Sequence, residues 1–544
     1  MRILGISPTH DSSVAIINDG HIEYFCKEER LSRSKRDARP FLSIDNAIKY
    51  AKGKIDYVVI SSPTKVDNLN NQLEHYIRKK LNLSCFRMCD HHHLTHASLA
   101  HHNSGFDETL VVVIDRNGSF HDRLRESETV FLANEMGYKP LYKSFWLQKI
   151  GIYEDSLNYE KAKEVTKDFI DCDVVAESTM NITKVYETAT TLIGQSPLEN
   201  GKTMGLSAYG KNQKFKSLFV DDVPNTNLFV SKDMFSEPVI MKEHLDKQIT
   251  NVPNENYNFY ADYAYQVQHQ TMIQVEKLIR KYLQKTGIKK VCLTGGYGLN
   301  VVTNEHLVKT FPDIKFYFEP LADDSGNSLG AALYVYKDKT GNKKSSKLKH
   351  TFFNNIKHDI PIKGIPTTTK QIAKYLSEGK IVAVFNGHAE AGPRALGNRS
   401  ILFDSRNPDA KQIVNGVKKR EWYRPFAGSI LVEHMKDYFN IYHLTESPFM
   451  TISFQVKEDK KKLIPGVIHV DNSCRVQSVD KDIPHFYDLL TEFNHITNVP
   501  VLLNTSFNMA GEPLVETFED AINTFNETKI DIIWFPEKQM MIKK

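Results

Sequence analysis

Short apolar runs alternate with polar segments along the chain, and their period separates strands from helices. Residues 1–18 predict two strands joined by a polar turn at residues 8–13. Residues 262–285 repeat with the period of a helix. Further strand-like runs lie at residues 57–61, 110–115 and 290–294. Strands that alternate with helices predict a mixed or parallel sheet covered by helices, so the expected fold class is α/β.

A change of composition divides this pattern. Residues 337–349, KDKTGNKKSSKLK, are rich in Lys, Ser and Gly and carry no apolar period. Beyond them, strand-like runs return at residues 381–385, 428–432 and 499–503. We therefore expect a first domain over residues 1–345, a linker over 346–365 and a second α/β domain over 366–544.

Composition narrows the class of protein. The 544 residues are 41% hydrophobic and 25% charged, which is typical of globular proteins and excludes disordered and fibrous classes. The net charge of +4 is too small to identify a nucleic-acid-binding protein. No apolar run approaches the roughly 20 residues that cross a bilayer, and no secretory signal is visible at Met1. We expect a cytoplasmic protein with no membrane partner, whose six scattered cysteines are reduced.

The first candidate site contains two histidines and two acids. His92 and His96, in HHHLTHA, share one face if this segment is helical. Asp115 ends the apolar run LVVVID, and Asp324 precedes Ser-Gly in a loop that opens a helix. Two imidazoles and two carboxylates suit a divalent metal such as Fe(II), with Mn(II) or Zn(II) as alternatives. A polar helix face is the competing interpretation of the histidines alone.

Glycine-rich turns form the second candidate. Gly295 and Gly296, with Asn300, follow a strand in TGGYGLN, and Gly205 lies in KTMGLSAYG. Such turns bring backbone amides close to phosphates or a nucleotide. Neither segment matches the phosphate-binding or dinucleotide-binding consensus, and each could be a simple turn.

The third candidate is a C-terminal group of cations and short polar side chains. Arginine offers a fixed fork of donors for phosphate, and serine and asparagine add short-range donors. These residues lie among Gly, Pro, Trp and Phe rather than on a Lys/Glu-rich face, so we expect an anion site. Its members are Arg394, Arg399, Lys418, Arg420, Arg424, Ser506 and Asn508.

The motifs resemble one family over nearly the whole chain. They are SPTHDSSVAIINDG, EERLSRSK, HHLTHA, MGLSAYG, LTGGYGLN, GPRALGNRS, KKREWYRPF, HVDNSCRVQSV and NTSFNMAGEPLVE. In this order they are similar to the O-carbamoyltransferases of antibiotic and nodulation-factor biosynthesis, the NodU/CmcH type. The resemblance implies an N-terminal domain of the actin and sugar-kinase superfamily, related to tRNA threonylcarbamoyl transferases, fused to a YrdC-like C-terminal domain.

The resemblance also implies a reaction. The YrdC-like domain would make carbamoyl adenylate from carbamoyl phosphate and ATP with Mg, and the N-terminal metal site would pass the carbamoyl group to a hydroxyl. His92, His96, Asp115 and Asp324 match the family's metal ligands. The K-x-R pair Lys418 and Arg420 and the S-x-N pair Ser506 and Asn508 match the nucleotide site.

Two further matches concern the acceptor. His10 matches a loop histidine thought to receive the acceptor's proton, a role that suits an imidazole because it titrates near neutrality. Lys35, in SRSK, matches a position near the acceptor. The chain departs from the family in two places: Asp115 is followed by Arg116 where Asp-Gly is usual, and residues 471–473 read Asp-Asn-Ser where Asp-Gly-Thr is usual.

The acceptor has two interpretations. A small hydroxylated metabolite, sugar or antibiotic fits most of the family, whereas 5-hydroxymethylcytosine in phage DNA fits the basic segment 27–39, which could follow a phosphate backbone. That segment contains the bases Lys27, Arg30, Arg33, Lys35, Arg36 and Arg39 against the acids Glu28, Glu29 and Asp37.

Other functions fit less of the sequence. An ATP-dependent small-molecule kinase would not need the arginine-rich C-terminal part, and a nucleotide-binding regulator would not need His10 together with metal histidines. Threonylcarbamoyl transfer to tRNA normally divides this chemistry between separate proteins. A monomer and an oligomer are both compatible with the sequence.

Overall fold

The computed structural model describes residues 1–63, 68–88, 91–121, 124–147, 169, 171–177, 181–212, 215–225, 229–231, 239–241, 257–342, 344–354 and 364–544. They form two compact units. Unit 1 contains Met1–Val58, Ile77–Ser84 and Leu348–Lys544, and unit 2 contains Val59–Tyr76 and Cys85–Lys347.

A five-stranded sheet uses the start of the chain, in the order β3-β2-β1-β4-β5. Its strands are β1 Arg2–Ser7, β2 Ser13–Asn18, β3 His21–Lys27, β4 Tyr57–Ser61 and β5 Cys85–Met88. The antiparallel pairing of β1 with β2 ends at Ser7 opposite Ser13, so residues 8–12 form the predicted polar turn. Three helices accompany these strands: α1 Glu28–Ser32, α2 Phe41–Tyr50 and α3 Asn68–Leu81.

Unit 2 is built around a seven-stranded sheet. Its strands are β6 Thr109–Ile114, β7 Phe120–His121, β8 Leu124–Asn134, β9 Gly137–Leu147, β10 Asp173–Glu177, β15 Lys290–Thr294 and β16 Lys315–Phe318. All six residues of β6 are buried, as its unbroken apolar run predicts for a central strand. β6 runs parallel to β15, so Asp115 and Gly295 follow their strands at one edge of the sheet.

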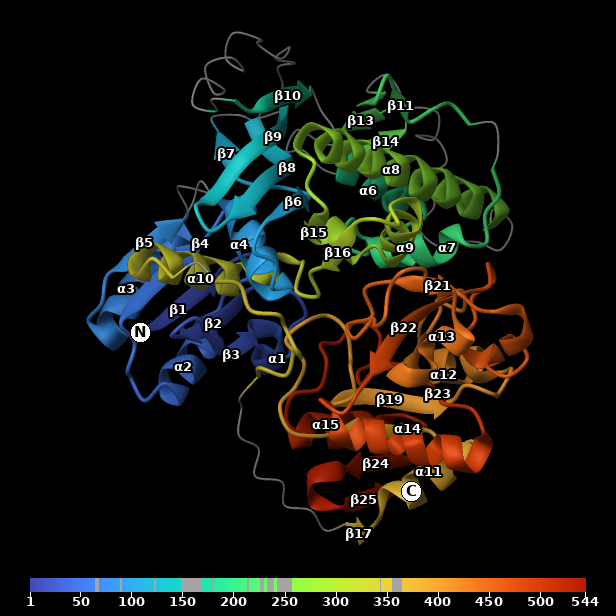
Figure 1. Ribbon diagram of the computed structural model, residues 1–544. Helices are drawn as coiled ribbons and strands as arrows, with labels where there is room; N and C mark the ends of the chain where they lie inside the picture. Colours follow the sequence, from blue (N-terminus) through green and yellow to red (C-terminus); the bar gives the residue numbers. More distant parts are fainter. Residues whose placement is uncertain are drawn as a thin grey trace. The chain divides into compact units, whose positions relative to one another are not determined.

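Six helices of the described part accompany this sheet (Figure 1); two of them, α4 and α8, pack directly on its strands, and the others pack on these two. They are α4 His92–Ser104, α6 Ile182–Leu192, α7 Asn200–Ser207, α8 Tyr257–Thr286, α9 Val301–Thr310 and α10 Asn327–Thr340. α4 and α10 lie in direct contact, and a Cβ on Gly330 would come within 2.0 Å of the carbonyl oxygen of Thr95. Only glycine permits this approach. Two short hairpins complete the described part: β11 Phe219–Val220 with β12 Val223–Pro224, and β13 Phe229–Ser231 with β14 Val239–Met241.

The C-terminal part of unit 1 is a nine-stranded mixed sheet in the order β17-β25-β24-β18-β19-β23-β20-β22-β21. The strands are β17 Ile365–Pro366, β18 Val382–Phe385, β19 Arg399–Asp404, β20 Ala427–Leu431, β21 Ser453–Gln455, β22 Ser473–Val479, β23 Val501–Ser506, β24 Ile532–Phe535 and β25 Met540–Lys543. Its helices are α11 Thr369–Ser377, α12 Ala410–Lys418, α13 Met435–Tyr438, α14 Pro484–Thr497 and α15 Phe518–Glu527. α11 and α14 lie side by side and bury Leu376, Phe486 and Leu490 against the sheet (Figure 1).

The predicted α/β class is confirmed, and the predicted strand and helix positions hold with small shifts at their ends. The compact units differ from the predicted domains because residues 1–58 group with residues 348–544. The change of unit at Lys347 and Leu348 falls within the predicted linker 346–365, whose residues 355–363 lie outside the described part. None of the described helices is both long and apolar enough to serve as a membrane span.

Candidate functional site

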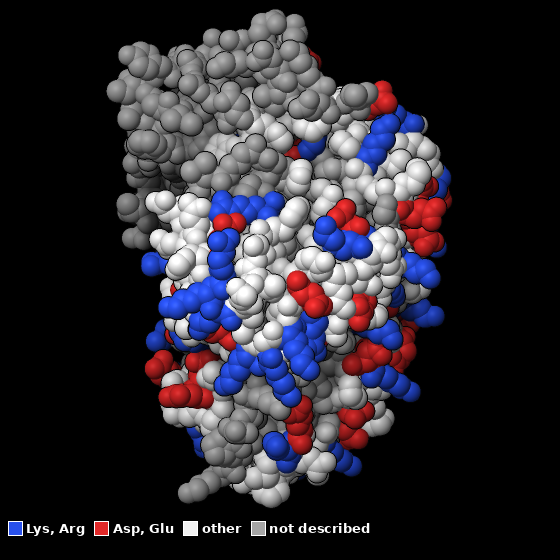
Figure 2. Space-filling model, turned by 90° about the vertical axis from the view of Figure 1, so that its left-hand side faces the viewer, with Lys and Arg blue, Asp and Glu red and all other residues white. Residues whose placement is uncertain are grey.

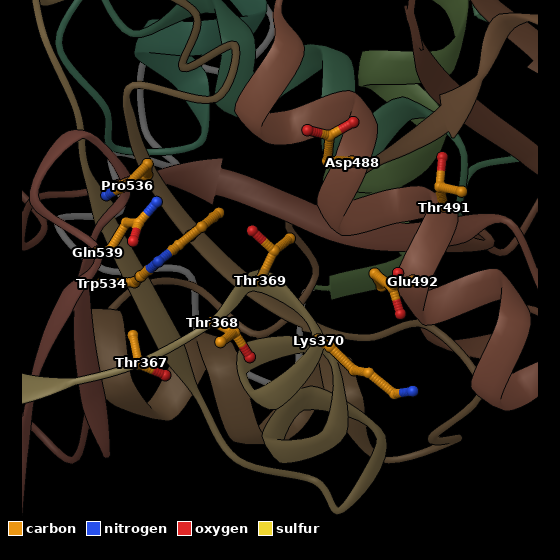
Figure 3. A pocket seen from close by; sticks show the side chains of 10 residues that line it. All are labelled: Thr367, Thr368, Thr369, Lys370, Asp488, Thr491, Glu492, Trp534, Pro536 and Gln539. Atoms are coloured by element: carbon orange, nitrogen blue, oxygen red, sulfur yellow. The ribbon is translucent and has the colours of Figure 1, made fainter.

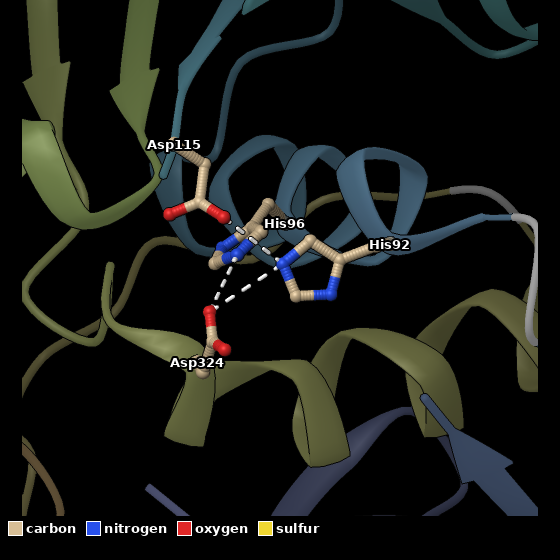
Figure 4. A group of neighbouring side chains, drawn as sticks. All are labelled: His92, His96, Asp115 and Asp324. Atoms are coloured by element: carbon tan, nitrogen blue, oxygen red, sulfur yellow. Dashed lines mark hydrogen bonds and ion pairs between the residues drawn. The ribbon is translucent and has the colours of Figure 1, made fainter. Parts of the chain in front are cut away.

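Four potential metal ligands converge in unit 2 (Figure 4). His92 and His96 lie one turn apart on α4, Asp115 follows β6, and Asp324 begins the 3-10 turn before α10. One ligand atom from each residue lies within 4.8 Å of the other three. The structure therefore brings together all four residues that the sequence proposed as a metal site.

The distances within this group leave room for a cation. Nε2 of His92 lies 3.1 Å from Oδ2 of Asp115 and 3.4 Å from Oδ1 of Asp324. Nε2 of His96 lies 3.6 Å from the same Asp324 oxygen. Figure 4 shows the two imidazoles and the two carboxylates pointing toward a common centre.

A positive charge between Asp115 and Asp324 would stabilise these two buried carboxylates. Burial lowers the pKa of His92, but the carboxylates of Asp324 and Asp115 outweigh it and raise the pKa to about 10. Burial and Asp324 raise the pKa of Asp115, yet the hydrogen bond from His92 and the charges of both histidines hold it below its ordinary value. A divalent cation supplies the same charge while leaving both imidazoles neutral as ligands. The residues thus fit a metal ion.

Further side chains hold these ligands in place. The backbone N–H of His92 donates to Oγ of Ser119 at 3.0 Å. The amide of Asn327 lies 3.1 Å from Nε2 of His96, and the hydroxyl of Thr95 donates to Oδ1 of Asn327 at 2.6 Å. Sequence reasoning missed Ser119 and Asn327, although Asn327 lies only three residues after Asp324.

The glycines of TGGYGLN support the metal ligands. The N–H of Gly296 donates to Oδ1 of Asp115 at 3.1 Å. Gly295 has φ 80°, and a Cβ there would meet the carbonyl oxygen of Ile114 at 2.4 Å. Asn300 caps α9 by accepting from the N–H of Thr303. Gly205 is buried within α7. Nucleotide binding by these four predicted residues stays a prediction.

A second site candidate lies in unit 1, where Lys418 ends α12. Lys418 is 3% exposed, and its ammonium donates to the backbone oxygen and the hydroxyl of Ser506. It also donates to the backbone oxygen and Oδ1 of Asn508, at 2.8 and 3.0 Å. The predicted K-x-R and S-x-N pairs are thus in direct contact.

Arginines crowd around Lys418. Burial and the like charge of Arg424 lower the pKa of Arg420 well below its ordinary value. Burial, followed by the like charges of Arg394 and Arg420, lowers the pKa of Arg475 in the same way. Nε of Arg475 is buried and makes no hydrogen bond to a described residue. We call Lys418, Arg394, Arg420, Arg424 and Arg475 the cationic cluster; an anion bound there would relieve their mutual repulsion.

Three groups hold the guanidinium of Arg420. Its Nε donates to Oδ1 of Asn415, its Nη2 donates to the carbonyl oxygen of Pro425 at 3.0 Å, and its guanidinium lies 4.1 Å from the ring centre of Phe426. Arg424 forms an ion pair with Glu421 at 3.5 Å. A guanidinium fixed in this way presents its donors in a constant direction.

Arg399 connects loops of the protein. It is fully buried, its guanidinium lies 3.7 Å from the ring centre of Phe385, and Nη1 and Nη2 donate to carbonyl oxygens that include those of Asn386 and Glu516. These bonds join loops of the nine-stranded sheet. We therefore leave Arg399 out of the proposed anion-binding groups, and include Arg475, which the sequence analysis did not single out.

Comparison with known families decides the identity. The carbamoyltransferase N-terminus model matches residues 71–333, and the carbamoyltransferase C-terminus model matches residues 373–544. The chain belongs to the carbamoyltransferase family. The metal-ligand group and the cationic cluster lie in the two parts of this carbamoyltransferase that the two models match.

Two nodulation proteins agree with this assignment. Nodulation protein NolNO of Sinorhizobium fredii is 27% identical over 96% of this chain and 77% of its own length. Nodulation protein U of Rhizobium tropici is 33% identical over 46% of this chain and 43% of its own length. Among solved structures, full-length HypF in the phosphate- and nucleotide-bound form is 15% identical, covering 63% of this chain and 56% of HypF with a TM-score of 0.38.

The two departures from the family pattern have local partners in this carbamoyltransferase. Nε of Arg116 pairs with Oε1 of Glu187 at 2.6 Å, so its charge is balanced by a carboxylate other than the metal ligands. Oδ1 of Asp471 accepts hydrogen bonds from the N–H and the hydroxyl of Ser473 at 3.0 and 2.7 Å. The Asp-Asn-Ser segment therefore forms a turn that leads into β22, the strand of Arg475, whose first residue is Ser473.

The remaining predicted residues lie in unit 1. His10, in the β1–β2 turn, is partly exposed and lies 3.3 Å from Asp11, which pairs with Lys27 at 2.9 Å. Lys35 is exposed in the loop after α1, and its like charge contributes to the lowered pKa of Lys418. The structure thus associates Lys35 with the cationic cluster.

A separate hollow of about 420 Å³ opens in unit 1 beside the start of α11 (Figure 3). Two acids, Asp488 and Glu492, and one base, Lys370, are among the residues of its wall. None of the predicted site residues contributes to its wall, so we assign it no part in the reaction. It is lined by Thr367, Thr368, Thr369, Lys370, Asp488, Thr491, Glu492, Trp534, Pro536 and Gln539.

Proposed function

We propose that this carbamoyltransferase makes carbamoyl adenylate from carbamoyl phosphate and ATP and then transfers the carbamoyl group to an acceptor hydroxyl. In the first stage water splits carbamoyl phosphate into carbamate and phosphate. A carbamate oxygen then attacks the α-phosphorus of ATP and releases pyrophosphate. In the second stage the acceptor oxygen attacks the carbamoyl carbon, AMP leaves, and a base takes the hydroxyl proton.

The observation that carries this proposal is the cationic cluster around Lys418. Carbamoyl phosphate and ATP bring several negative charges together, and these charges must be neutralised before one anion can attack another. The five cations of this cluster, next to the hydroxyl of Ser506 and the amide of Asn508, can do this. A small-molecule kinase that used only the other unit would not require this cluster.

The group in unit 2 would hold the metal through His92, His96, Asp115 and Asp324. A metal ion there would supply Lewis-acid stabilisation of oxygen charge during transfer. Neighbouring groups position these ligands: Ser119 holds the backbone of His92, Gly296 holds the carboxylate of Asp115, and the amide of Asn327 lies against the ring of His96.

The products of ATP test the proposed function directly. With carbamoyl phosphate present, we expect AMP and pyrophosphate, measured by phosphorus NMR. ADP as the product of ATP would identify a kinase instead. If ATP gives neither AMP nor ADP, the result would contradict the proposed enzyme mechanism and favour a nucleotide-binding protein.

His10 is proposed as the base that collects the acceptor's proton. An unassisted hydroxyl is not ionised at neutral pH, and general base catalysis contributes roughly 10²- to 10⁴-fold. His10→Asn should lower carbamoyl transfer by about that factor while pyrophosphate release stays unchanged. His21→Asn, an exposed histidine at the start of β3, is the matched control. Normal transfer by His10→Asn would remove His10 from the mechanism.

Two acceptor classes are compatible with this reaction: a small hydroxylated metabolite, and a hydroxymethyl pyrimidine such as 5-hydroxymethylcytosine in DNA. The segment that suggested DNA does not offer a continuous basic surface, because Lys27 and Arg30 are buried and only 5% and 3% exposed. A different surface supports DNA. We call it the α2–α3 basic face, and its exposed members are Lys49, Lys52, Lys54, Arg78, Lys79 and Lys80.

Figure 2 looks onto the side of the molecule where α2 and α3 lie, and Lys and Arg gather across the middle of that side. Lys80 of α3 pairs with Asp45 of α2 at 3.1 Å, so the end of α3 lies beside α2 and the charge of Lys80 is balanced by this acid. The last turn of α3 carries Arg78, Lys79 and Lys80 with no acid in the first turn. This distribution favours a polyanionic acceptor.

A salt series distinguishes the acceptors. If duplex DNA containing 5-hydroxymethylcytosine is the acceptor, Arg78→Glu with Lys79→Glu should weaken binding and flatten the slope of affinity against salt by about one per lost phosphate contact. Lys374→Glu, an exposed lysine on α11, is the control. If the affinity for DNA does not depend on salt, or does not change in the double variant, DNA is not the acceptor and a small molecule is favoured.

A further inference from the structure

The EERLSRSK segment belongs structurally to the anion site of unit 1, and we propose that Lys35 binds a phosphate group of carbamoyl phosphate or ATP there. This inference rests on the proposed function, since it assigns a new residue to the adenylate-forming stage. It differs from what the family resemblance implies for Lys35, which is a position near the acceptor.

Arg30 anchors the segment to the loop before β19. It is 3% exposed, and its Nη2 donates to the carbonyl oxygens of Glu390 and Gly392 at 3.3 and 3.4 Å. The same loop is held by Glu390, whose Oε1 accepts from the backbone N–H groups of Leu396 and Asn398 at 2.8 and 3.0 Å. The loop between these contacts carries Arg394, a member of the cationic cluster.

Arg33 anchors the segment to a second loop of the cluster. Its Nη1 donates to the carbonyl oxygen of Leu514 at 2.8 Å, its Nη2 donates to that of Pro513 at 3.2 Å, and its Nε lies 3.3 Å from Oδ1 of Asp520. Residues 506–514 form the loop that follows β23. Arg33 therefore binds one end of the loop whose other end, at Ser506 and Asn508, binds Lys418.

Hydrogen bonds within this loop hold its two ends in a fixed arrangement. The amide of Asn508 donates to the carbonyl oxygen of Glu512 at 2.7 Å, and the N–H of Val515 donates to that of Phe507 at 3.0 Å. The N–H of Ala510 donates to the carbonyl oxygen of Lys418 at 3.0 Å. Arg33 and Lys418 are thus joined through one compact piece of backbone.

Lys35 follows Arg33 in a tight turn. Arg33 and Arg36 have φ of 57° and 61°, and the N–H of Arg36 donates to Oε2 of Glu29 at 3.0 Å. Two left-handed residues so close together fix the direction of the loop between them. The charge of Lys35 reaches Lys418 strongly enough to contribute to its lowered pKa. A phosphate placed beside Lys418 would therefore also attract Lys35.

The test separates adenylation from transfer in the full-length protein. Exchange of labelled pyrophosphate into ATP, in the presence of carbamoyl phosphate, reports the first stage, and product formation reports the second. Lys35→Met keeps the length of the side chain and removes its charge. Arg39→Met removes an exposed cation of the same loop and is the matched control.

We expect Lys35→Met to lower exchange roughly 10²-fold, the loss typical of one charged donor to a reacting group, whereas Arg39→Met keeps the parent rate. Transfer should fall in parallel, because less adenylate is made. Full exchange with loss of transfer alone would place Lys35 at the acceptor and overturn the inference, as would full activity in both assays. Absence of exchange in the parent protein would instead refute the proposed function.

Discussion

Replacement of Arg420 by alanine should abolish carbamoyl-phosphate-dependent pyrophosphate release. Its guanidinium is held on one side by Asn415, Pro425 and Phe426, so its direction is fixed before any substrate binds. Loss of a preorganised charged donor at a site of developing charge typically costs about 10²- to 10³-fold.

Two controls make this result specific. Lys419→Ala removes the exposed cation directly before Arg420 and should release pyrophosphate at the parent rate. Arg420→Lys keeps a positive charge but loses the planar fork, so it should fall between the parent and the alanine variant. Full pyrophosphate production by Arg420→Ala would refute the assignment of the adenylate-forming stage to this cluster.

Removal of the metal ligands should affect the other stage of the reaction, carbamoyl transfer, and spare adenylate formation. We expect His92→Ala with His96→Ala to stop carbamoyl transfer while pyrophosphate exchange remains, since both histidines lie in unit 2 and the cationic cluster lies in unit 1. Metal content, measured by elemental analysis, should fall to background. The two carboxylates left behind are only half of the ligand set, and they lack the imidazoles that suit Fe(II) and Zn(II).

His91→Ala is the matched control for the metal variant. His91 is the exposed neighbour in the same run of histidines, and the residue precedes α4. It should keep both metal and transfer. Equal metal occupancy in the double variant and the parent would show that the ligands lie elsewhere, and retained transfer without metal would separate the ion from the reaction.

The sequence predicted those parts of the sites that lie where strands and helices end. The apolar run before Asp115 and the strand before Gly295 locate one edge of a sheet, and the spacing of His92 and His96 locates one face of a helix. These are local patterns, because each depends on the period of a single element. The four metal ligands therefore came together as expected.

Long-range contacts explain what the sequence did not predict. Arg30 binds the carbonyl oxygen of Glu390, 360 positions away, and no periodic pattern links those segments. The grouping of residues 1–58 with the C-terminal part follows from such contacts. Arg475 was missed because it lies within a strand, β22, where an arginine usually indicates a solvent-facing position.

Tertiary structure also distinguishes Arg399 from Arg394. In GPRALGNRS, Arg394 and Arg399 look alike as candidate phosphate ligands. The fold places Arg399 at the first position of β19, fully buried against Phe385, where carbonyl oxygens take its donors. Composition around an arginine indicates an anion site, but only the fold decides which guanidinium is still directed toward it.

The central claim is that one chain divides carbamoyl transfer between an adenylate-forming site and a metal site, and pyrophosphate exchange tests it most directly. Labelled pyrophosphate should enter ATP only when carbamoyl phosphate is present, at the parent rate in His92→Ala with His96→Ala and at background in Arg420→Ala. Exchange that disappears with the metal ligands, or that persists without Arg420, would contradict this division of the reaction.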